Sequence, residues 1–486
     1  MSAIVETQRP TTVLQRAWQR LVDANPVLAK EILVTSRTPA YAGAIVGTPL
    51  LLAGIVLAAR WMTNDLAFDG SPVVRLYLVW VAIFLGALGA ILGSTLVVHD
   101  RENGTLEALR FSRVRASSIA LAKLASVVLA QVVVVACTLP LIGYFVVSSG
   151  VSLAGIAVAA VLALALGALT AAVGIGVSAH APNTRVAHVV SLFGAALIWI
   201  AVCAWYAASW RLTGCLHGCD AVDGYLGASF DRRYVSLLIV IPGCGFAIVL
   251  WGGIAAAISG LLDTSEDRSL PIKRWALSAV AMVALATFAA ASGAEKDARA
   301  AIAGVALFAI ALGAVVLHFA FVGEPLSPSH RMRARPARSI LRRLSPPSLV
   351  PSIGFTIVTG ALGFVGIPLL VQSPDVALAG LWVLFYVSAL GGFMGFVAAR
   401  KGARRARWMG AIAAPVFLLS LLEDHSRGAA ALDCVCPFWL RHASGGEASA
   451  VWSCSLALWA LTACVMLGSM IRASREAASA LPLKKY

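Results

Sequence analysis

Charged side chains are few in this chain. The group of them best suited to binding or catalysis lies in residues 97–123, VVHDRENGTLEALRFSRVRASSIALAK. Asp100, Arg101 and Glu102 open the charged part of this stretch, and Lys123 lies one turn inside the apolar segment that follows. Side chains of this kind either make polar contacts with another protein or keep a loop in solvent. The sequence has no Gly-x-Ser-x-Gly elbow, no His-Glu-x-x-His helix and no carboxylate pair within an apolar segment, so the pattern indicates binding and not catalysis.

The same stretch predicts a short helix. Gly104 completes an Asn-Gly turn signal, Thr105 can cap a helix start, and Glu107 suits the first turn, where the helix dipole favours a carboxylate. Leu106 and Leu109 lie three residues apart and give this helix an apolar edge. Since a plain turn between two spans would not need such an edge, we expect it to contact something.

The composition of the chain defines the setting of this helix. Hydrophobic residues make up 60% of the chain, charged residues 13%, and the mean hydropathy is +0.87, which lies outside the range of soluble globular proteins. A membrane span needs about 20 apolar residues, and the chain has enough for about twelve. We therefore expect an all-α, polytopic membrane protein with about twelve transmembrane helices. Their expected positions are roughly residues 41–59, 73–98, 118–147, 151–179, 186–208, 235–259, 274–293, 298–322, 354–372, 376–398, 408–422 and 450–471.

Basic residues are concentrated in alternate loops of this layout, which the positive-inside rule assigns to the cytoplasmic side. Both termini are therefore expected in the cytoplasm, and the protein in the inner or plasma membrane of the cell. Two basic runs, in residues 331–343 and 400–407, contribute to the net charge of +15. Contact with anionic lipid explains both without any nucleic acid. A docking surface for a cytoplasmic partner is the alternative for these runs.

A second helical signal precedes the first span. Residues 11–22, TTVLQRAWQRLV, place apolar side chains on one side and Gln and Arg side chains on the other. This pattern predicts an amphipathic helix in the membrane interface, with Trp18 at headgroup level; a disordered basic tail is the alternative. Asn25 can then cap a second short helix that has Pro26 at its first position.

Two sequence boxes resemble those of a known family. The elbow motif consists of Asn25, Pro26, Leu28, Lys30 and Glu31, and the later box combines Asp100, Arg101 and Glu102 with Gly104, Thr105, Leu106 and Glu107, followed by Lys123. In this order the boxes resemble permease subunits of ATP-binding-cassette transporters of the type-2 export class. The resemblance covers roughly residues 20–260.

This resemblance implies an elbow helix in the interface, a permease core of six spans, and a pairing of permeases as a homodimer or heterodimer. It also implies a separate cytoplasmic ATPase subunit, which would bind ATP and magnesium. The chain has no Gly-x-x-x-x-Gly-Lys-Ser/Thr loop, so we do not expect it to be an enzyme itself.

The resemblance also assigns residues to contact with the ATPase. The coupling residues would be Asp100, Arg101, Glu102, Gly104, Thr105, Leu106, Glu107, Leu109 and Lys123. Among them, Asp100, Glu102 and Glu107 would make polar contacts with the partner, and Leu106 and Leu109 apolar ones. The loop between the fourth and fifth spans would add a secondary contact through Asn183, Thr184 and Arg185.

The expected domain organisation has four parts. Residues 1–40 form cytoplasmic interfacial and elbow helices, and residues 41–260 form the six-span permease core. Residues 261–273 form a cytoplasmic linker. Residues 274–486 form an appended membrane domain of six spans that carries neither box.

Four of the nine cysteines lie in loops expected on the outer side: Cys215, Cys219, Cys434 and Cys436. In an oxidising compartment such cysteines form disulfides. A soft-metal site for copper or zinc, with His217, His425 or His442 as a further ligand, is the alternative.

The sequence favours the permease of an ATP-driven exporter over two alternatives. A secondary carrier of the major-facilitator type also has twelve spans with both ends inside, but carriers driven by protons or sodium need a titratable group within the membrane, and no expected span has Asp or Glu at its middle. The other alternative is a membrane scaffold whose 97–123 helix recruits a cytoplasmic protein.

Overall fold

A computed structural model describes most of the chain. The described residues are 26–63, 71–111, 114–149, 153–213, 239–262, 265–291, 349–370 and 374–401, with single positions in 303–314 and at 465 and 468. Every secondary-structure element in these ranges is a helix, which agrees with the all-α prediction.

The chain divides into two compact units. Unit 1 comprises residues 1–234 and 246–263, and unit 2 comprises residues 235–245 and 264–486. The helices of unit 1 are α2 (Pro26–Ser36), α3 (Pro39–Thr63), α4 (Ser71–Glu102), α5 (Thr105–Phe111), α6 (Ala116–Ser149), α7 (Leu153–His180), α8 (Thr184–Thr213) and most of α11 (Ile241–Leu261). Those of unit 2 are α12 (Ser265–Ala291), α16 (Leu349–Gly360), the π-helical turn η2 (Ala361–Gly366), α17 (Ile367–Leu370) and α18 (Pro374–Lys401).

Six described helices are long and apolar enough to cross a membrane, so this is a multi-pass membrane protein. The six stretches are Val81–Glu102, Ala116–Leu139, Ala160–His180, Thr184–Cys203, Ile241–Leu261 and Leu270–Ala291. They coincide with six of the expected spans. The first expected span lies in α3, of which Tyr41–Leu51 is a shorter apolar helix. The span expected at 408–422, the helix expected at 11–22 and most of the spans expected at 298–322 and 450–471 lie outside the described residues, so the total of twelve stays a prediction.

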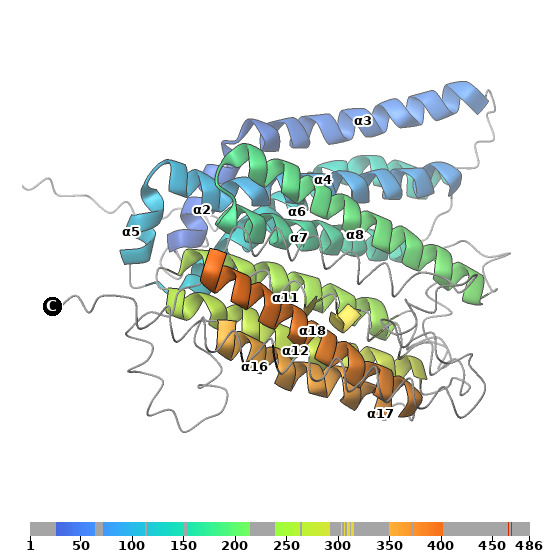
Figure 1. Ribbon diagram of the computed structural model, residues 1–486. Coiled ribbons are helices and arrows are strands. Elements are labelled where there is room, and N and C mark those ends of the chain that lie inside the picture. The colour runs from blue at the N-terminus through green and yellow to red at the C-terminus, as the bar shows by residue number, and fades with distance from the viewer. Residues whose placement is uncertain are drawn as a thin grey trace, which may run out of the picture. The chain divides into compact units, whose positions relative to one another are not determined.

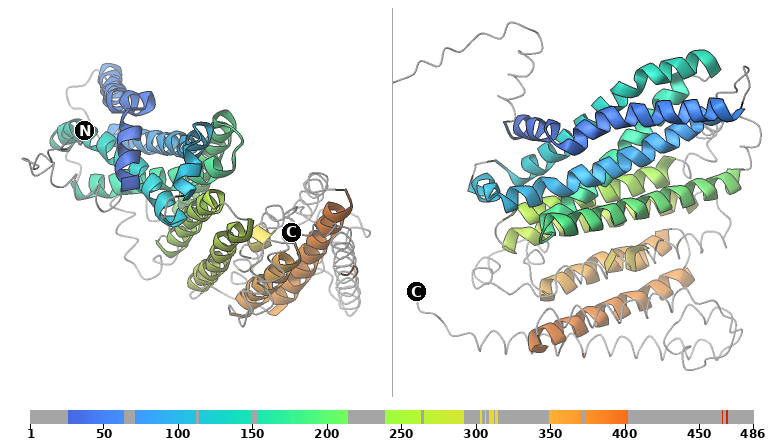
Figure 2. Two further views of the ribbon diagram at one scale, coloured as in Figure 1. Left: turned by 90° about the vertical axis from the view of Figure 1, so that its left-hand side faces the viewer. Right: turned by 90° about the horizontal axis from the view of Figure 1, so that it is seen from above.

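Within unit 1, α4, α6, α7 and α8 run side by side (Figures 1 and 2). Small residues let α4 and α7 approach very closely, as is common where helices pack inside a membrane. A Cβ atom on Gly93 of α4 would lie 2.6 Å from the carbonyl oxygen of Ala171 on α7. A Cβ atom on Gly174 of α7 would lie 2.9 Å from the carbonyl oxygen of Ala90. The backbones of the two helices are therefore in direct contact.

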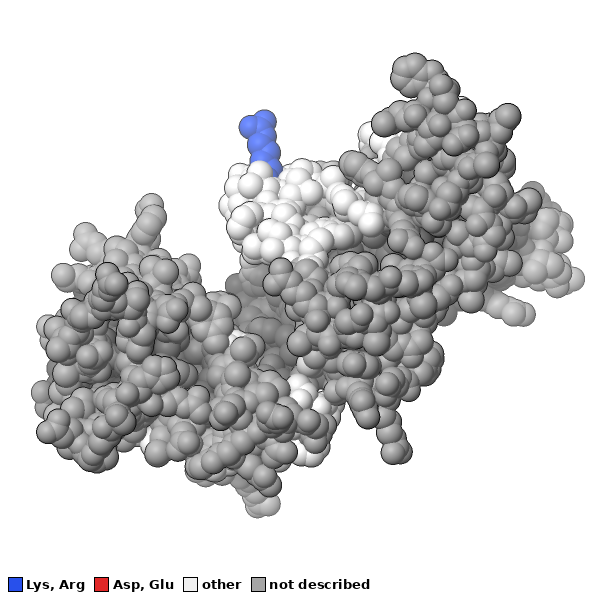
Figure 3. All heavy atoms as spheres, turned by 90° about the vertical axis from the view of Figure 1, so that its right-hand side faces the viewer, with Lys and Arg blue, Asp and Glu red and all other residues white. Residues whose placement is uncertain are grey.

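One end of unit 1 gathers the polar part of the bundle. The short helices α2 and α5 both lie there (Figure 1), and α2 packs against α6 while α5 follows α4. Seen from the opposite end, the small described part of the surface shows a basic side chain among uncharged ones (Figure 3). Among the described residues, the ion pairs lie at this end, between side chains of α2, α4 and α6.

Candidate functional site

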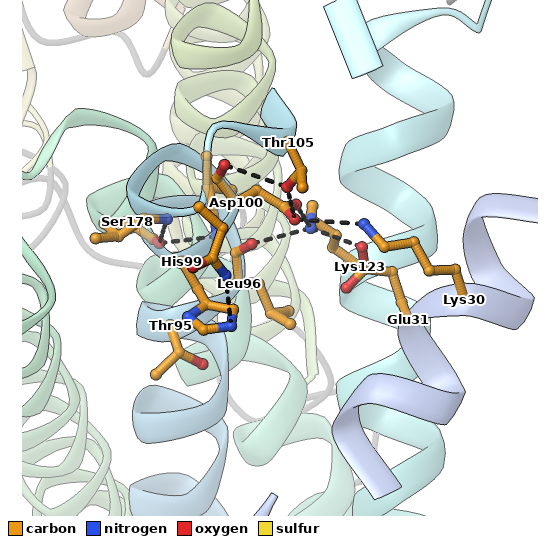
Figure 4. Close-up of polar contacts among 12 residues, drawn as sticks. Lys30, Glu31, Thr95, Leu96, His99, Asp100, Thr105, Lys123 and Ser178 are labelled. Carbon is orange, nitrogen blue, oxygen red and sulfur yellow. Dashed lines mark hydrogen bonds and ion pairs between the residues drawn. The ribbon is translucent and has the colours of Figure 1, made fainter. Parts of the chain in front are cut away.

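The centre of this polar end is Lys123, whose side chain is completely buried. Its ammonium group donates to Glu31 Oε1 at 2.8 Å, to Asp100 Oδ2 at 2.6 Å and to the carbonyl oxygen of Leu96 at 3.0 Å (Figure 4). An ammonium group has three donors, so all three of its protons are used. Lys123 thereby joins α6 to α2 and to the last turns of α4.

Asp100 is the second hub of the cluster. Its Oδ1 atom accepts a hydrogen bond from Thr105 Oγ1 at 2.8 Å and lies 3.4 Å from Lys30 Nζ (Figure 4). Lys30 is partly exposed, with 44% of its side-chain surface accessible, whereas Asp100 is 10% accessible. Two carboxylates and two ammonium groups therefore neutralise one another at this end of the bundle. We call Lys30, Glu31, Asp100, Thr105 and Lys123 the Lys123 cluster.

The turn between α4 and α5 delivers Thr105 to this cluster. Gly104 has a φ of +72°, a left-handed conformation that side chains other than those of Asn and Asp rarely adopt. Its amide donates to the carbonyl oxygen of Arg101 at 3.1 Å, and the amide of Asn103 donates to that of His99 at 3.0 Å. These bonds end α4 and allow α5 to start at Thr105, where the sequence predicted a helix.

Arg101 fastens the end of α4 to the end of α7. Its guanidinium group donates to the carbonyl oxygen of Ala181 at 2.7 Å and also to that of Ala179. Carbonyl groups at a helix C-terminus have no partner within the helix, and a cation is favoured there by the helix dipole. Arg101 thus contacts the protein's own backbone.

Glu102 joins the α4–α5 turn to the loop between α7 and α8. Its carboxylate accepts one hydrogen bond from the amide of Thr184 at 3.1 Å and another from the Thr184 hydroxyl at 2.8 Å. Asn183 Oδ1 accepts from the amide of Val186 at 2.9 Å and caps α8. The two loops that the resemblance assigned to partner contact are therefore linked to each other.

The structure brings most of the predicted residues together and shows what three of them contact within the protein. Leu106 is 4% exposed and belongs to the apolar core of unit 1, and Leu109 packs against that core. Asp100 is buried and forms an ion pair with Lys123. These side chains contact the protein's own helices, and their expected contact with a partner stays a prediction. Glu107 is exposed.

Sequence reasoning missed several buried polar residues of the same bundle. Ser178 of α7 accepts hydrogen bonds from the amides of Val97 and Val98, and Ser94 of α4 lies 2.5 Å from Nδ1 of His188 on α8. A polar side chain within a long apolar segment was the available signal. The sequence alone did not show which helix each of these side chains would meet.

Asn25 and the cysteines Cys215, Cys219, Cys434 and Cys436 lie outside the described residues. In the part of the chain that the structure describes, no group of three His, Cys, Asp or Glu side chains could hold a metal ion.

Comparison with known proteins identifies the part of the chain that holds the cluster. No curated protein and no solved structure matches the chain. The model of the ABC-2 type transporter family matches residues 26–206, which span α2 to most of α8 and include the whole Lys123 cluster. This part of the chain is an ABC-2 type transporter domain, the permease domain of an ABC transporter.

Proposed function

We propose that the chain is the membrane subunit of an ATP-driven exporter and that a separate cytoplasmic ATPase binds it at the α5 end. The observation that carries this proposal is the joining of both sequence boxes and of both loops into one bonded unit. The Lys123 cluster connects α2, α4, α5 and α6, and Glu102 connects α4 to the start of α8. A force applied at this end therefore reaches several spans at once.

The proposed binding surface consists of the exposed side chains around this unit. We call it the α5 face, and it comprises Glu102, Asn103, Glu107, Ala108, Asn183 and Arg185. It carries charges of both signs beside neutral groups, as suits a polar contact between two proteins. The α5 face leaves out Asp100, Leu106 and Leu109, whose observed contacts are with the protein's own helices.

The mechanism we propose is a two-state movement without a chemical step in this chain. ATP bound and hydrolysed on the partner would supply the free energy. Closure of two ATPase subunits would push on α5, and the bonded unit would carry that push to α4, α6 and α8 as a rigid-body rotation. The permease would act as a homodimer or heterodimer, with its α5 end in the cytoplasm and its spans in lipid. The appended unit 2 would accompany it in the same inner or plasma membrane.

Capture of the tagged chain from gently solubilised membranes tests this function. We expect an ATPase to be captured with the wild-type chain. Gly104 offers a matched pair of variants, since a Cβ atom there would meet nothing within 4 Å and only the positive φ is at stake. Gly104→Asn should keep the turn, because Asn tolerates this conformation. Gly104→Val should displace α5 at a cost of roughly 1–2 kcal/mol and lose most of the ATPase.

Membrane content provides the control for this pair. Both variants should accumulate in the membrane as the wild type does, because Gly104 is exposed and lies at the end of a span. Equal capture of the ATPase by Gly104→Val and Gly104→Asn would contradict the assigned role of the turn. A wild-type chain that carries no ATPase would contradict the function itself.

A further inference from the structure

A second polar contact lies deeper in the bundle, at Gln131 of α6. Gln131 is eight residues beyond Lys123, which is about 12 Å along a helix. Its side chain is completely buried. Its Nε2 atom donates to the carbonyl oxygen of Leu85 on α4 at 3.1 Å. Gln131 thus bonds α6 to α4 far from the Lys123 cluster.

Two glycines make room for this amide group. A Cβ atom on Gly167 of α7 would lie 2.7 Å from both Nε2 and Oε1 of Gln131. A Cβ atom on Gly89 of α4 would lie 2.7 Å from Nε2. The amide therefore occupies a notch between α4 and α7 that exists because neither glycine has a side chain, and all three helices meet there.

The need to fill the notch does not by itself explain why residue 131 carries an amide. Among the described residues, Gln131 Oε1 has no hydrogen-bond partner although it is buried. An unpaired buried acceptor is unfavourable, and the neighbouring buried side chains include the apolar Leu85, Leu88 and Val127. A methionine has nearly the same length and no such oxygen. What the amide adds over methionine is the bond to Leu85.

We propose that Gln131 is a positioning residue whose amide locks α6 to α4 and α7 within the membrane. With Lys123 at one end and Gln131 two turns deeper, α6 is held to α4 at two levels and cannot slide or swing independently. The three helices then move as one body. The consequence for transport rests on the proposed function: a push at the α5 end would move these helices together as far as the level of Gln131. The lock itself does not rest on that function.

Thermal unfolding of the purified full chain tests the lock. Gln131→Met keeps the volume and removes the bond, and we expect it to lower the melting temperature by about 2–4 °C. Gln131→Glu is the conservative variant: a protonated carboxyl can still donate to the Leu85 carbonyl, and an ionised one cannot. Its melting temperature should lie near that of the wild type at acid pH and fall as pH rises, and Gln131→Met should lack this dependence.

Substitutions that change side-chain size test whether Gly167 makes room for the Gln131 amide. Gly167→Ala should lower the melting temperature, because the three atoms nearest to its new Cβ all belong to Gln131. Adding Gln131→Ala should restore at least half of that loss by removing the obstructing amide. Gly89→Ala is the matched control: its new Cβ also meets the backbone carbonyl of Gly167, so Gln131→Ala should not rescue it.

If Gln131→Met melted at or above the wild-type temperature, the proposed lock would be refuted, because the amide would then contribute only its volume. So would an equal rescue of Gly89→Ala and Gly167→Ala by Gln131→Ala. None of these measurements involves the ATPase. A wild-type chain that captures no ATPase but shows the expected order of melting temperatures would therefore refute the proposed function and leave the lock standing.

Discussion

Replacing Lys123 by methionine is expected to destabilise the permease domain by about 3–5 kcal/mol, the range for removing one partner of a buried ion pair. The carboxylates of Glu31 and Asp100 would remain buried, with 3% and 10% of their side-chain surfaces accessible, and would lose the cation between them. Lys30 lies 3.4 Å from Asp100, and among the described residues its ammonium group forms no ion pair with Glu31. Thermal unfolding of the purified chain and its amount in the membrane both report this loss.

Other residues of the Lys123 cluster provide a control variant and substitutions that should compensate for the loss of Lys123. Lys30→Met removes a lysine that contacts the same Asp100 but is half exposed, so we expect a loss of only about 0–1 kcal/mol. Adding Glu31→Gln and Asp100→Asn to Lys123→Met removes the uncompensated charges and should recover a substantial part of the stability. Equal melting temperatures for Lys123→Met and Lys30→Met would show that the buried lysine does not hold the cluster together.

Gly93→Ala is expected to be a strongly damaging single-methyl change in the α4–α7 contact. The new Cβ would lie 2.6 Å from the carbonyl oxygen of Ala171 and 3.2 Å from its Cα. These are backbone atoms, which cannot rotate away, so the helices must separate. We expect a loss of about 1–3 kcal/mol, as for other overpacked interiors, measured by thermal unfolding.

The same change at Gly47 of α3 provides the comparison. A Cβ atom there would meet nothing within 4 Å, and Ala is a better helix former than Gly by roughly 0.5–1 kcal/mol. Gly47→Ala should therefore melt no lower than the wild type. If both substitutions lowered the melting temperature alike, glycine would matter at these positions for a reason other than the approach of α7.

The sequence predicted those features that local signals determine. The Asn-Gly turn and Thr105 predicted the start of α5, Pro26 begins α2 as expected, and six apolar stretches became six candidate spans. Each of these follows from residues within one or two turns of one another. The family resemblance added the association of the two boxes with a permease.

The sequence could not predict the contacts that join distant segments. Glu31 and Lys123 are 92 positions apart, and nothing local to either shows that they form an ion pair. Leu106 has the same apolar edge whether a partner or the protein's own core covers it, and only the packed bundle shows that the core does. The role of the glycines beside Gln131 and Ala171 likewise depends on the helix that approaches them.

Site-specific cross-linking from the α5 face tests the central proposal most directly. A photoreactive residue would replace Ala108 of α5 or, as a control, Ala201 of α8. Both alanines are exposed, and position 201 lies about 25 Å along α8 from the end that Glu102 binds. We predict that illumination of membranes links the Ala108 variant to an ATPase subunit and that the Ala201 variant yields no such product. An Ala108 variant that forms no ATPase product, in membranes where the protein is present at the wild-type level, would contradict the account.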